Sequence, residues 1–317
     1  MTLSLIHTRN EKTAPHSHRT PGFASLELKW EAVTLFRYIY DPDMPQSESP
    51  KPFFHPVNTL AGDLITNYRP HDHVWHKGIQ MTIAHLHGQN FWGGGSYLHG
   101  RGYVDLPNNG TQRHDGWDSI EIEDNRFAAT ERLSWITQAG EHWIDETRGI
   151  AVETVDPDAG YWALDFTTSL RNVRGKSLHI GSPTTSGRPL AGYGGLFWRG
   201  PRSFDNGEVI TAAGHEGADA MGQAAPWLAY TGRHDGNGNA STLAFLDHPA
   251  NLRYPNKWFI RQTPYACASF AFMFDEVYEF DAGETITQRY RLVIANGGWD
   301  AAQVEAAAEA WRGNVGN

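Results

Sequence analysis

Apolar and polar residues alternate along much of this chain, and that period of two constrains its fold more than any other feature. Between Ser25 and Tyr40 the alternation is typical of a strand buried on one face. Similar runs lie at Ser119–Glu123, Phe127–Thr137, Trp143–Val155, Tyr161–Leu170, Thr242–Asp247, Ser269–Asp275 and Thr285–Ile294. Turn signals such as Asn109-Gly110 separate them. These patterns favour a mainly β protein, either an antiparallel β-sandwich or a barrel, and of the two we expect the sandwich.

One segment near the C-terminus has a helical pattern. Asp300 and Gln303 form a capping box at the start of a helix expected over Asp300–Arg312. Apolar residues at positions i, i+4 and i+7 then share one face, namely Val304, Ala308 and Trp311. We expect this helix to close the β-sandwich.

No shift of composition divides the chain into two domains. Residues 1–24 are polar and are expected to form a loose N-terminal leader without a secretory signal. Residues 25–317 are expected to form a single large β-sandwich catalytic domain. Because no stretch approaches about 18 apolar residues, we expect no membrane span and a cytoplasmic protein.

Charge and cysteine content exclude several classes of function. The 317 residues contain 36 acidic and 26 basic side chains, a net charge of -10, which argues against a nucleic-acid partner. Cys267 is the only cysteine, so no disulfide within the chain and no zinc site built on several cysteines can form. Between two alanines, Cys267 itself is expected to be a small core residue.

Histidines are concentrated in one part of the sequence. Of 16 in the chain, seven lie within one segment: His55, His71, His73, His76, His85, His87 and His99. Imidazole titrates near neutral pH, so this group is suited to acid–base catalysis. His71, His73 and His76 could alternatively hold a divalent metal with further ligands, but we expect no cofactor. A third interpretation is that several of these histidines only bind the backbone in loops.

Two later regions combine charged groups with aromatic residues. The segment from Asp247 to Arg261 follows an apolar strand and contains His248, Arg253 and Trp258. Glycines followed by Trp198 and Arg199 predict a second strand that lines a polar cleft. Twelve tryptophans beside polar residues favour recognition of a sugar, whose faces are apolar and whose rims are polar, although most tryptophans are expected in the core.

The motifs resemble a family of unknown function that commonly carries the label "methane oxygenase PmoA". The resemblance covers residues 25–312 and is carried by Phe54-His-Pro, Asp72–Gly78, Asn90–Trp92, Tyr193–Gly195 and Asp247–Arg261. This chain departs from the family pattern at Trp75, where histidine is usual. The label itself is misleading, because a particulate methane monooxygenase subunit is an integral membrane protein. The end of the chain resembles mutarotase-like sugar enzymes, which implies a galactose-mutarotase-like supersandwich and a carbohydrate substrate.

From these observations we expect a carbohydrate-active enzyme, most simply a glycoside hydrolase. The predicted catalytic residues are His73, His76, Glu146, Asp247 and His248, with Asp247 and Glu146 as the carboxylates. The predicted substrate-binding residues are His55, Asp72, His85, His87, Trp92, Arg253, Trp258 and Arg261. Two alternatives stay open. One is an epimerase, mutarotase or β-eliminating lyase acting on a 3-keto sugar, and the other is a non-catalytic sugar-binding β-sandwich. A homo-oligomer is also expected.

Overall fold

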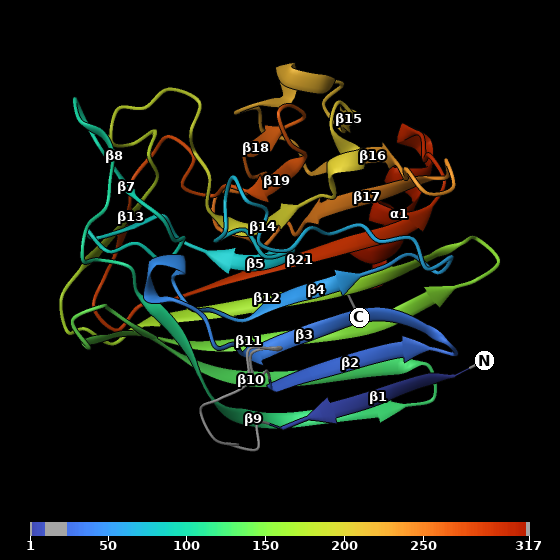
Figure 1. The fold of residues 1–317 in the computed structure, drawn as a ribbon, viewed down its shortest axis with the longest axis horizontal. Coiled ribbons are helices and arrows are strands. Elements are labelled where there is room, and N and C mark those ends of the chain that lie inside the picture. Colours follow the sequence, from blue (N-terminus) through green and yellow to red (C-terminus); the bar gives the residue numbers. More distant parts are fainter. Residues whose placement is uncertain (1, 10–23, 315–317) are drawn as a thin grey trace.

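Two antiparallel sheets of eight strands each form the body of the protein in a computed structural model that describes residues 2–9 and 24–314 (Figure 1). The first sheet contains, in spatial order, β1 (Leu3–Thr8), β2 (Ala24–Trp30), β3 (Val33–Asp41), β4 (Phe53–Val57), β5 (Ile79–Thr82), β14 (Gly195–Arg199), β19 (Cys267–Phe270) and β18 (Trp258–Arg261). The second contains β15 (Glu208–Thr211), β16 (Trp227–Arg233), β17 (Ala240–Asp247), β21 (Thr285–Asn296), β12 (Tyr161–Asn172), β11 (His142–Asp156), β10 (Arg126–Ile136) and β9 (Thr111–Glu123). The expected antiparallel β-sandwich is confirmed.

Smaller elements lie at the ends of the sandwich. One three-stranded sheet contains β20 (Tyr278–Phe280), β13 (Leu178–Gly181) and β6 (His85–Leu86), and a hairpin contains β7 (Ser96–Leu98) and β8 (Gly102–Val104). Short 3-10 turns occupy Gln46–Glu48, Arg202–Phe204 and Gly217–Ala220. In the part of the chain that the structure describes, no helix is long and apolar enough to cross a membrane.

The main core lies between the two large sheets. Phe36 of β3 meets Trp162 of β12 with ring centroids 6.2 Å apart, and Phe54 of β4 meets Phe166 of β12 at 6.3 Å. All four side chains are buried. Alternation along each strand sends every second side chain into this layer, which is why the period of two in the sequence predicts the fold.

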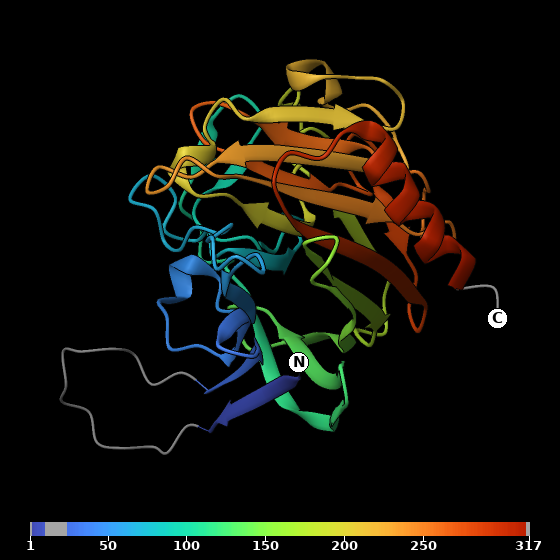
Figure 2. The ribbon, with the colours of Figure 1, turned by 90° about the vertical axis from the view of Figure 1, so that its right-hand side faces the viewer.

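Helix α1 (Ala301–Asn314) packs on the outer face of the second sheet (Figure 2). The capping box is formed as expected, because Gln303 N donates to Asp300 Oδ1 at 2.9 Å and Asp300 N donates to Gln303 Oε1 at 3.1 Å. The predicted face packs on β16, β17 and β21 through Val304, Ala308 and Trp311. The prediction of this helix is confirmed.

Three local expectations are corrected. Leu3–Thr8 belongs to the expected loose leader but forms strand β1, in which Leu3 pairs with Trp30 and is buried. The strand expected from Ser25 to Tyr40 is a hairpin that turns at Glu31, whose φ of 53° breaks the extended backbone. The strand expected over Ser269–Asp275 already ends at Phe270. Residues 10–23 of the expected leader lie outside the described residues.

The outer face of the first sheet is also covered, and this covering creates the site described below. On β14, Trp198 points into the main core, whereas Phe197 belongs to a second apolar cluster on the opposite face. Residues from the segments 58–78, 87–104 and 182–194 contribute to that outer layer. Every residue of β14 is therefore buried, although the strand has one face turned away from the core.

Candidate functional site

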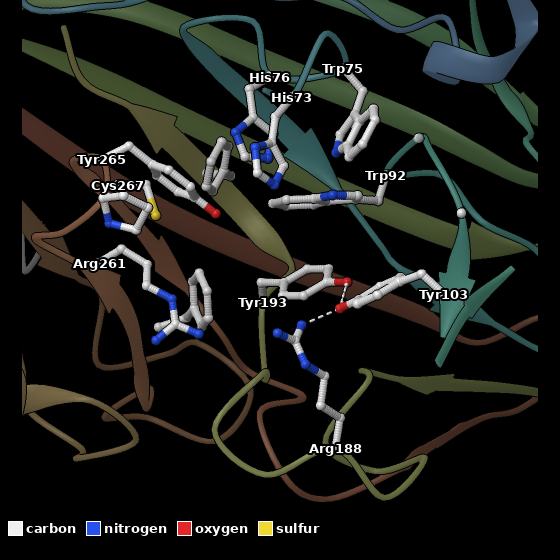
Figure 3. Close-up of a pocket in the computed structure, with 15 residues that line it drawn as sticks. His73, Trp75, His76, Trp92, Tyr103, Arg188, Tyr193, Arg261, Tyr265 and Cys267 are labelled. Atoms are coloured by element: carbon white, nitrogen blue, oxygen red, sulfur yellow. Dashed lines mark hydrogen bonds between the residues drawn. The ribbon is translucent and has the colours of Figure 1, made fainter. Parts of the chain in front are cut away.

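A cavity of about 510 Å³ lies over the outer face of β14, β18 and β19 (Figure 3). Its walls are mostly aromatic, and none of the described residues that line it is an aspartate or a glutamate. The lining residues are His73, Trp75, His76, Trp92, Gly93, Gly95, Tyr103, Arg188, Tyr193, Phe197, Phe259, Arg261, Pro264, Tyr265 and Cys267. Four residues predicted from the sequence, His73, His76, Trp92 and Arg261, therefore meet in one place.

His76 is held in one protonation state by Arg199, which follows Phe197 by two residues on β14. Arg199 Nη1 lies 2.9 Å from His76 Nδ1. A guanidinium has only donors, so Nδ1 must accept and the single imidazole proton must lie on Nε2. Burial, reinforced by His73 and neighbouring cations, lowers the pKa of His76 well below its ordinary value. His76 is thus a neutral hydrogen-bond donor, and its Nε2 has no partner among the described residues.

His73 lies beside His76 and has a different partner. The two imidazoles are stacked, with ring centroids 4.6 Å apart. His73 Nδ1 lies 3.0 Å from Asp72 Oδ2. Burial lowers the pKa of His73, and the bond to Asp72 partly offsets that effect. When neutral, His73 donates its Nδ1 proton to Asp72, so its Nε2 is free to accept a proton.

Asp72 connects the two histidines through Arg199. Arg199 Nη2 donates to Asp72 Oδ2 at 3.0 Å, and Arg202 lies 3.5 Å from Asp72 Oδ1. Burial opposes ionisation of Asp72, but its bonds to His73 and Arg199 are stronger and lower its pKa to about 2. Asp72 is therefore a carboxylate that orients His73 rather than an acid that faces the cavity.

Ion pairs to the buried carboxylate of Glu48 hold the loop that carries both histidines. Lys77 Nζ donates to Glu48 Oε2 at 2.5 Å, and Glu48 also pairs with Arg69 at 2.5 Å. Lys51 Nζ donates to Trp92 O at 3.0 Å, which ties the neighbouring loop to the same region. Glu48 and Lys77 are both buried, so removing either one would leave an uncompensated charge beside the cavity wall.

The glycine-rich stretch after Trp92 has a packing role. Gly93 has a φ of +110°, and a Cβ atom there would lie 2.6 Å from Trp75 Cβ and 2.8 Å from the Glu48 carbonyl oxygen. Gly94 has a φ of +67° and faces the ring of Trp75. Glycine is needed at both positions so that Trp75 and Trp92 can form one aromatic wall.

Several lining residues were not predicted from the sequence. Arg188 donates to the Tyr103 hydroxyl, and the Tyr103 and Tyr193 hydroxyls are 2.9 Å apart. Tyr265 lies under the guanidinium of Arg199 at 3.9 Å from the ring centroid. The glycines before Trp198 did predict a strand beside a cleft, and β14 is that strand. Nothing local to Arg188 or Tyr265 distinguishes them from ordinary loop residues.

Cys267 lines the cavity floor on β19 and is buried. Burial raises the pKa of its thiol to about 12. A thiol that stays protonated is a poor nucleophile, which agrees with the expected role as a small packing residue.

Asp247 and His248 lie elsewhere and organise the loop between β17 and β18. Asp247 accepts hydrogen bonds from Asn251 Nδ2 at 2.7 Å and from the backbone and side chain of Asn256, both at 2.8 Å. Burial raises its pKa to about 6. His248 accepts a bond from Ala250 N and packs against Trp311. Neither residue lines the cavity, although both were predicted as catalytic.

The remaining residues of that motif divide between structure and site. Arg253 donates to the carbonyl oxygens of Phe272, Glu276 and Val277, so it joins two loops. Trp258 is fully buried in the main core and donates to Ala225 O. Of the substrate-binding residues predicted here, only Arg261 reaches the cavity, because alternation on β18 turns Trp258 to the other face.

Glu146, the second predicted carboxylate, belongs to a buried polar network between the sheets. It accepts from Trp135 Nε1 at 2.7 Å and from Arg148 Nε at 2.8 Å. Arg148 also donates to Tyr38 of the first sheet, whose hydroxyl donates to Glu131. Glu146 and Asp247 therefore do not form a pair across the histidine cavity.

The other predicted histidines are dispersed. His55 is bonded to Thr66 at 2.9 Å, and burial lowers its pKa to about 4. His85 and His87 lie on and beside β6, next to a separate hollow, where His85 is bonded to Ser186 at 2.8 Å. His71 Nδ1 accepts from Arg202 at 2.8 Å.

The described residues do not include the metal site considered for His71, His73 and His76. Among them, no three or more His, Cys, Asp or Glu side chains are grouped so as to hold a metal ion. Of the histidines proposed as ligands, His71 and His76 each use Nδ1 to accept from an arginine.

Comparisons with known proteins add the following findings. Among curated protein sequences, none matches this chain. An α-galactosidase from Lactobacillus brevis is similar in structure at 11% identity and a TM-score of 0.41, over 90% of this chain and 41% of that one. A GH36 α-galactosidase from Geobacillus stearothermophilus is similar at 10% identity and a TM-score of 0.36, over 93% of this chain and 41% of that one. This chain thus spans less than half the length of either neighbour.

The sequence comparison gives the family. The sequence model of a family of unknown function, DUF6807, matches residues 25–309, which include every described residue that lines the cavity and almost all of the sandwich except strand β1. The chain therefore belongs to the family of unknown function DUF6807.

Proposed function

We propose that this protein is a carbohydrate-active enzyme that binds a sugar in the aromatic cavity. Trp75, Trp92 and Tyr265 offer flat apolar faces, and histidine and arginine side chains supply polar groups at the same walls. Sugar rings have apolar C–H faces and polar rims, so this combination of groups is complementary to them. The volume of about 510 Å³ is sufficient for a small glycoside.

We further propose that the reaction is proton transfer at a carbon next to a carbonyl group, as in β-elimination from a 3-keto glycoside. One observation carries this choice: two imidazoles with different fixed roles line the cavity, and no carboxylate lines it among the described residues. His73 has an Nε2 able to accept a proton, and His76 has an Nε2–H able to donate a hydrogen bond.

The proposed reaction consists of proton transfers and the cleavage of one C–O bond, with no net oxidation or reduction. His73 Nε2 takes the proton from C2 of the keto sugar, and the electron pair moves to the C3 oxygen, where the His76 N–H stabilises the enolate. The enolate then re-forms the ketone, the C1–O bond breaks, and C1 and C2 become joined by a double bond. The protonated His73 returns its proton to the leaving oxygen. Addition of water to that double bond would complete a net glycoside cleavage.

Hydrolysis by a pair of carboxylates is less well supported. That mechanism needs two carboxyl groups about 5–9.5 Å apart on either side of the bond. Asp247 and Glu146, the pair expected from the sequence, are engaged in separate structural networks. Epimerisation would use the same first step as elimination. Homo-oligomerisation and a cytoplasmic location stay predictions of the sequence.

The test is to compare a 4-nitrophenyl 3-keto-glucoside with the unoxidised 4-nitrophenyl glucoside in deuterated water. The proposal predicts nitrophenol release from the keto sugar alone, together with deuterium at C2 of the keto sugar that forms when water adds to the double bond, detected by NMR. The variant His73→Gln should lose both signals, whereas His71→Gln, a matched exposed histidine, should keep them. Cleavage of the unoxidised glycoside without exchange at C2 would favour hydrolysis. Binding of sugars with no turnover would favour the non-catalytic alternative.

A further inference from the structure

Two arginines line the cavity without an acidic partner. Arg188 and Arg261 are both half-buried, and neither has a carboxylate within ion-pair distance among the described residues. By contrast, Arg199 and Arg202 nearby share the carboxylate of Asp72. The chain as a whole has a net charge of -10, so a cavity lined by cations and by no described acid differs in charge from the molecule around it.

Both guanidinium groups are positioned by contacts that leave donors free. Arg188 donates to the Tyr103 hydroxyl and lies 5.0 Å from the centre of that ring, and the Tyr193 hydroxyl is bonded to the same Tyr103 hydroxyl. Arg261 lies 5.2 Å from the centre of the Phe259 ring and reaches Leu190 O at 3.5 Å. Each guanidinium has five N–H donors in a planar fork, so most of these donors are not used within the chain.

The two arginines lie across the cavity from the histidines. Figure 3 shows His73 and His76 at one wall and Arg188 and Arg261 toward the opposite one, with Trp92 and Tyr193 between them. A sugar that places its reacting carbons at the histidines would therefore direct its far end toward the arginines. Aromatic walls exclude water and strengthen charge–charge attraction at that end.

We propose that the substrate is an anionic sugar, whose carboxylate or phosphate monoester is bound by Arg188 and Arg261. This inference rests on the proposed function for the sugar part of the ligand. Both anions have oxygens that match the planar fork of a guanidinium, and the structure favours neither. A neutral sugar would leave two half-buried cations without a counter-charge.

The experiment is a calorimetric titration of the full chain with three matched sets, each a hexose, its uronate and its 6-phosphate, built on glucose, galactose and mannose. We expect at least one anionic sugar to bind about tenfold or more tightly than its neutral hexose. Whichever of the uronate and the 6-phosphate binds more tightly identifies the anion. Equal affinity within every set, or no binding in any, would overturn the proposal.

Variants test the two arginines directly. Arg188→Gln and Arg261→Gln should each weaken binding of the anionic sugar about tenfold more than they weaken binding of the neutral hexose. Arg233→Gln, an exposed arginine at the end of β16, removes the same charge and should change neither. A uniform loss for both sugars would show a packing defect and contradict the proposal.

The binding measurements and the keto-sugar assay test the anion-binding site and the proposed reaction separately. Preference for the anion without C2 exchange would retain this binding site and overturn the reaction. Turnover of a neutral 3-keto glycoside, with no preference for the anion, would support the proposed reaction and overturn the anion-binding site.

Discussion

Arg199 Nη1 donates a hydrogen bond to His76 Nδ1 at 2.9 Å, and this contact determines the chemistry open to His76. It assigns the ring proton to Nε2 and makes protonation unfavourable, because a second proton would face a guanidinium. His76 is therefore suited to stabilise a developing negative charge on oxygen, and His73 remains as the base.

Replacing Arg199 by methionine should release that control. We expect the imidazole of His76 to populate both tautomers, and turnover of the keto sugar to fall by about 10²-fold, as on loss of one oxyanion donor. Nitrogen-15 NMR of the imidazole reads the tautomer, and the rate is measured alongside it. The matched control is Arg202→Met, which removes the other arginine at Asp72 without touching His76. An unchanged tautomer in Arg199→Met would contradict the assignment.

The pH dependence of the reaction should report His73. Burial lowers its pKa below the ordinary value, and the base must be neutral, so kcat/KM should rise with pH through an acid limb below pH 6.5. Asp72 raises the pKa of His73, so Asp72→Asn should move this limb to lower pH. The rate on the plateau should also fall roughly tenfold or more, because His73 loses its orienting partner. A limb that moves to higher pH would refute the role of Asp72.

Asp247 should be important for stability rather than for chemistry. Asp247→Ala leaves the amides of Asn251 and Asn256 without their acceptor, and we expect a loss of roughly 2–4 kcal/mol in the free energy of unfolding. Denaturant unfolding measures this loss. Rates measured under conditions where the variant is folded should be close to wild type. Loss of activity with unchanged stability would instead restore Asp247 as a catalytic residue.

The same carboxyl group gives a stability change with pH. Its pKa is raised from 3.8 to about 6 by burial, so between these values the unfolded chain is ionised while the folded chain keeps the proton. Raising the pH across this window should therefore lower the free energy of unfolding, by on the order of 3 kcal/mol from this group. Comparing the pH profiles of wild type and Asp247→Ala isolates the contribution. If the two proteins gave parallel profiles of unfolding free energy against pH, the predicted contribution of Asp247 would be contradicted.

Glu146 should likewise be structural. Glu146→Ala leaves Arg148 buried beside fewer acceptors, and we expect a loss of about 3–5 kcal/mol in the free energy of unfolding. Glu153→Ala removes an exposed glutamate from the same strand and should change stability very little. If Glu146→Ala abolished turnover while its unfolding curve matched wild type, the carboxylate would have a chemical role.

Local patterns were sufficient to predict the elements of the sandwich. The period of two predicts the long strands β10, β11 and β12, because the two faces of each differ in burial. Strand β17 is buried on both faces, because α1 covers its outer face, and its apolar run predicts it instead. The capping box and apolar face of α1 are also local, so the helix and its buried side were predictable. The hairpin turn at Glu31 was not, since a charged residue with positive φ continues the alternating pattern.

For the candidate site, the sequence and the tertiary structure each determined a different part. The sequence by itself determined that histidines, arginines and tryptophans are concentrated in particular segments, and it identified His73, His76, Trp92 and Arg261 as candidates. Only the tertiary structure decided that these four meet Arg188 and Tyr265, while Asp247 and Glu146 are drawn into separate networks. The reason is physical. Local spacing fixes which face a side chain occupies, but which faces meet depends on strand order in a sheet that joins β5, β14, β19 and β18, distant in sequence and adjacent in space.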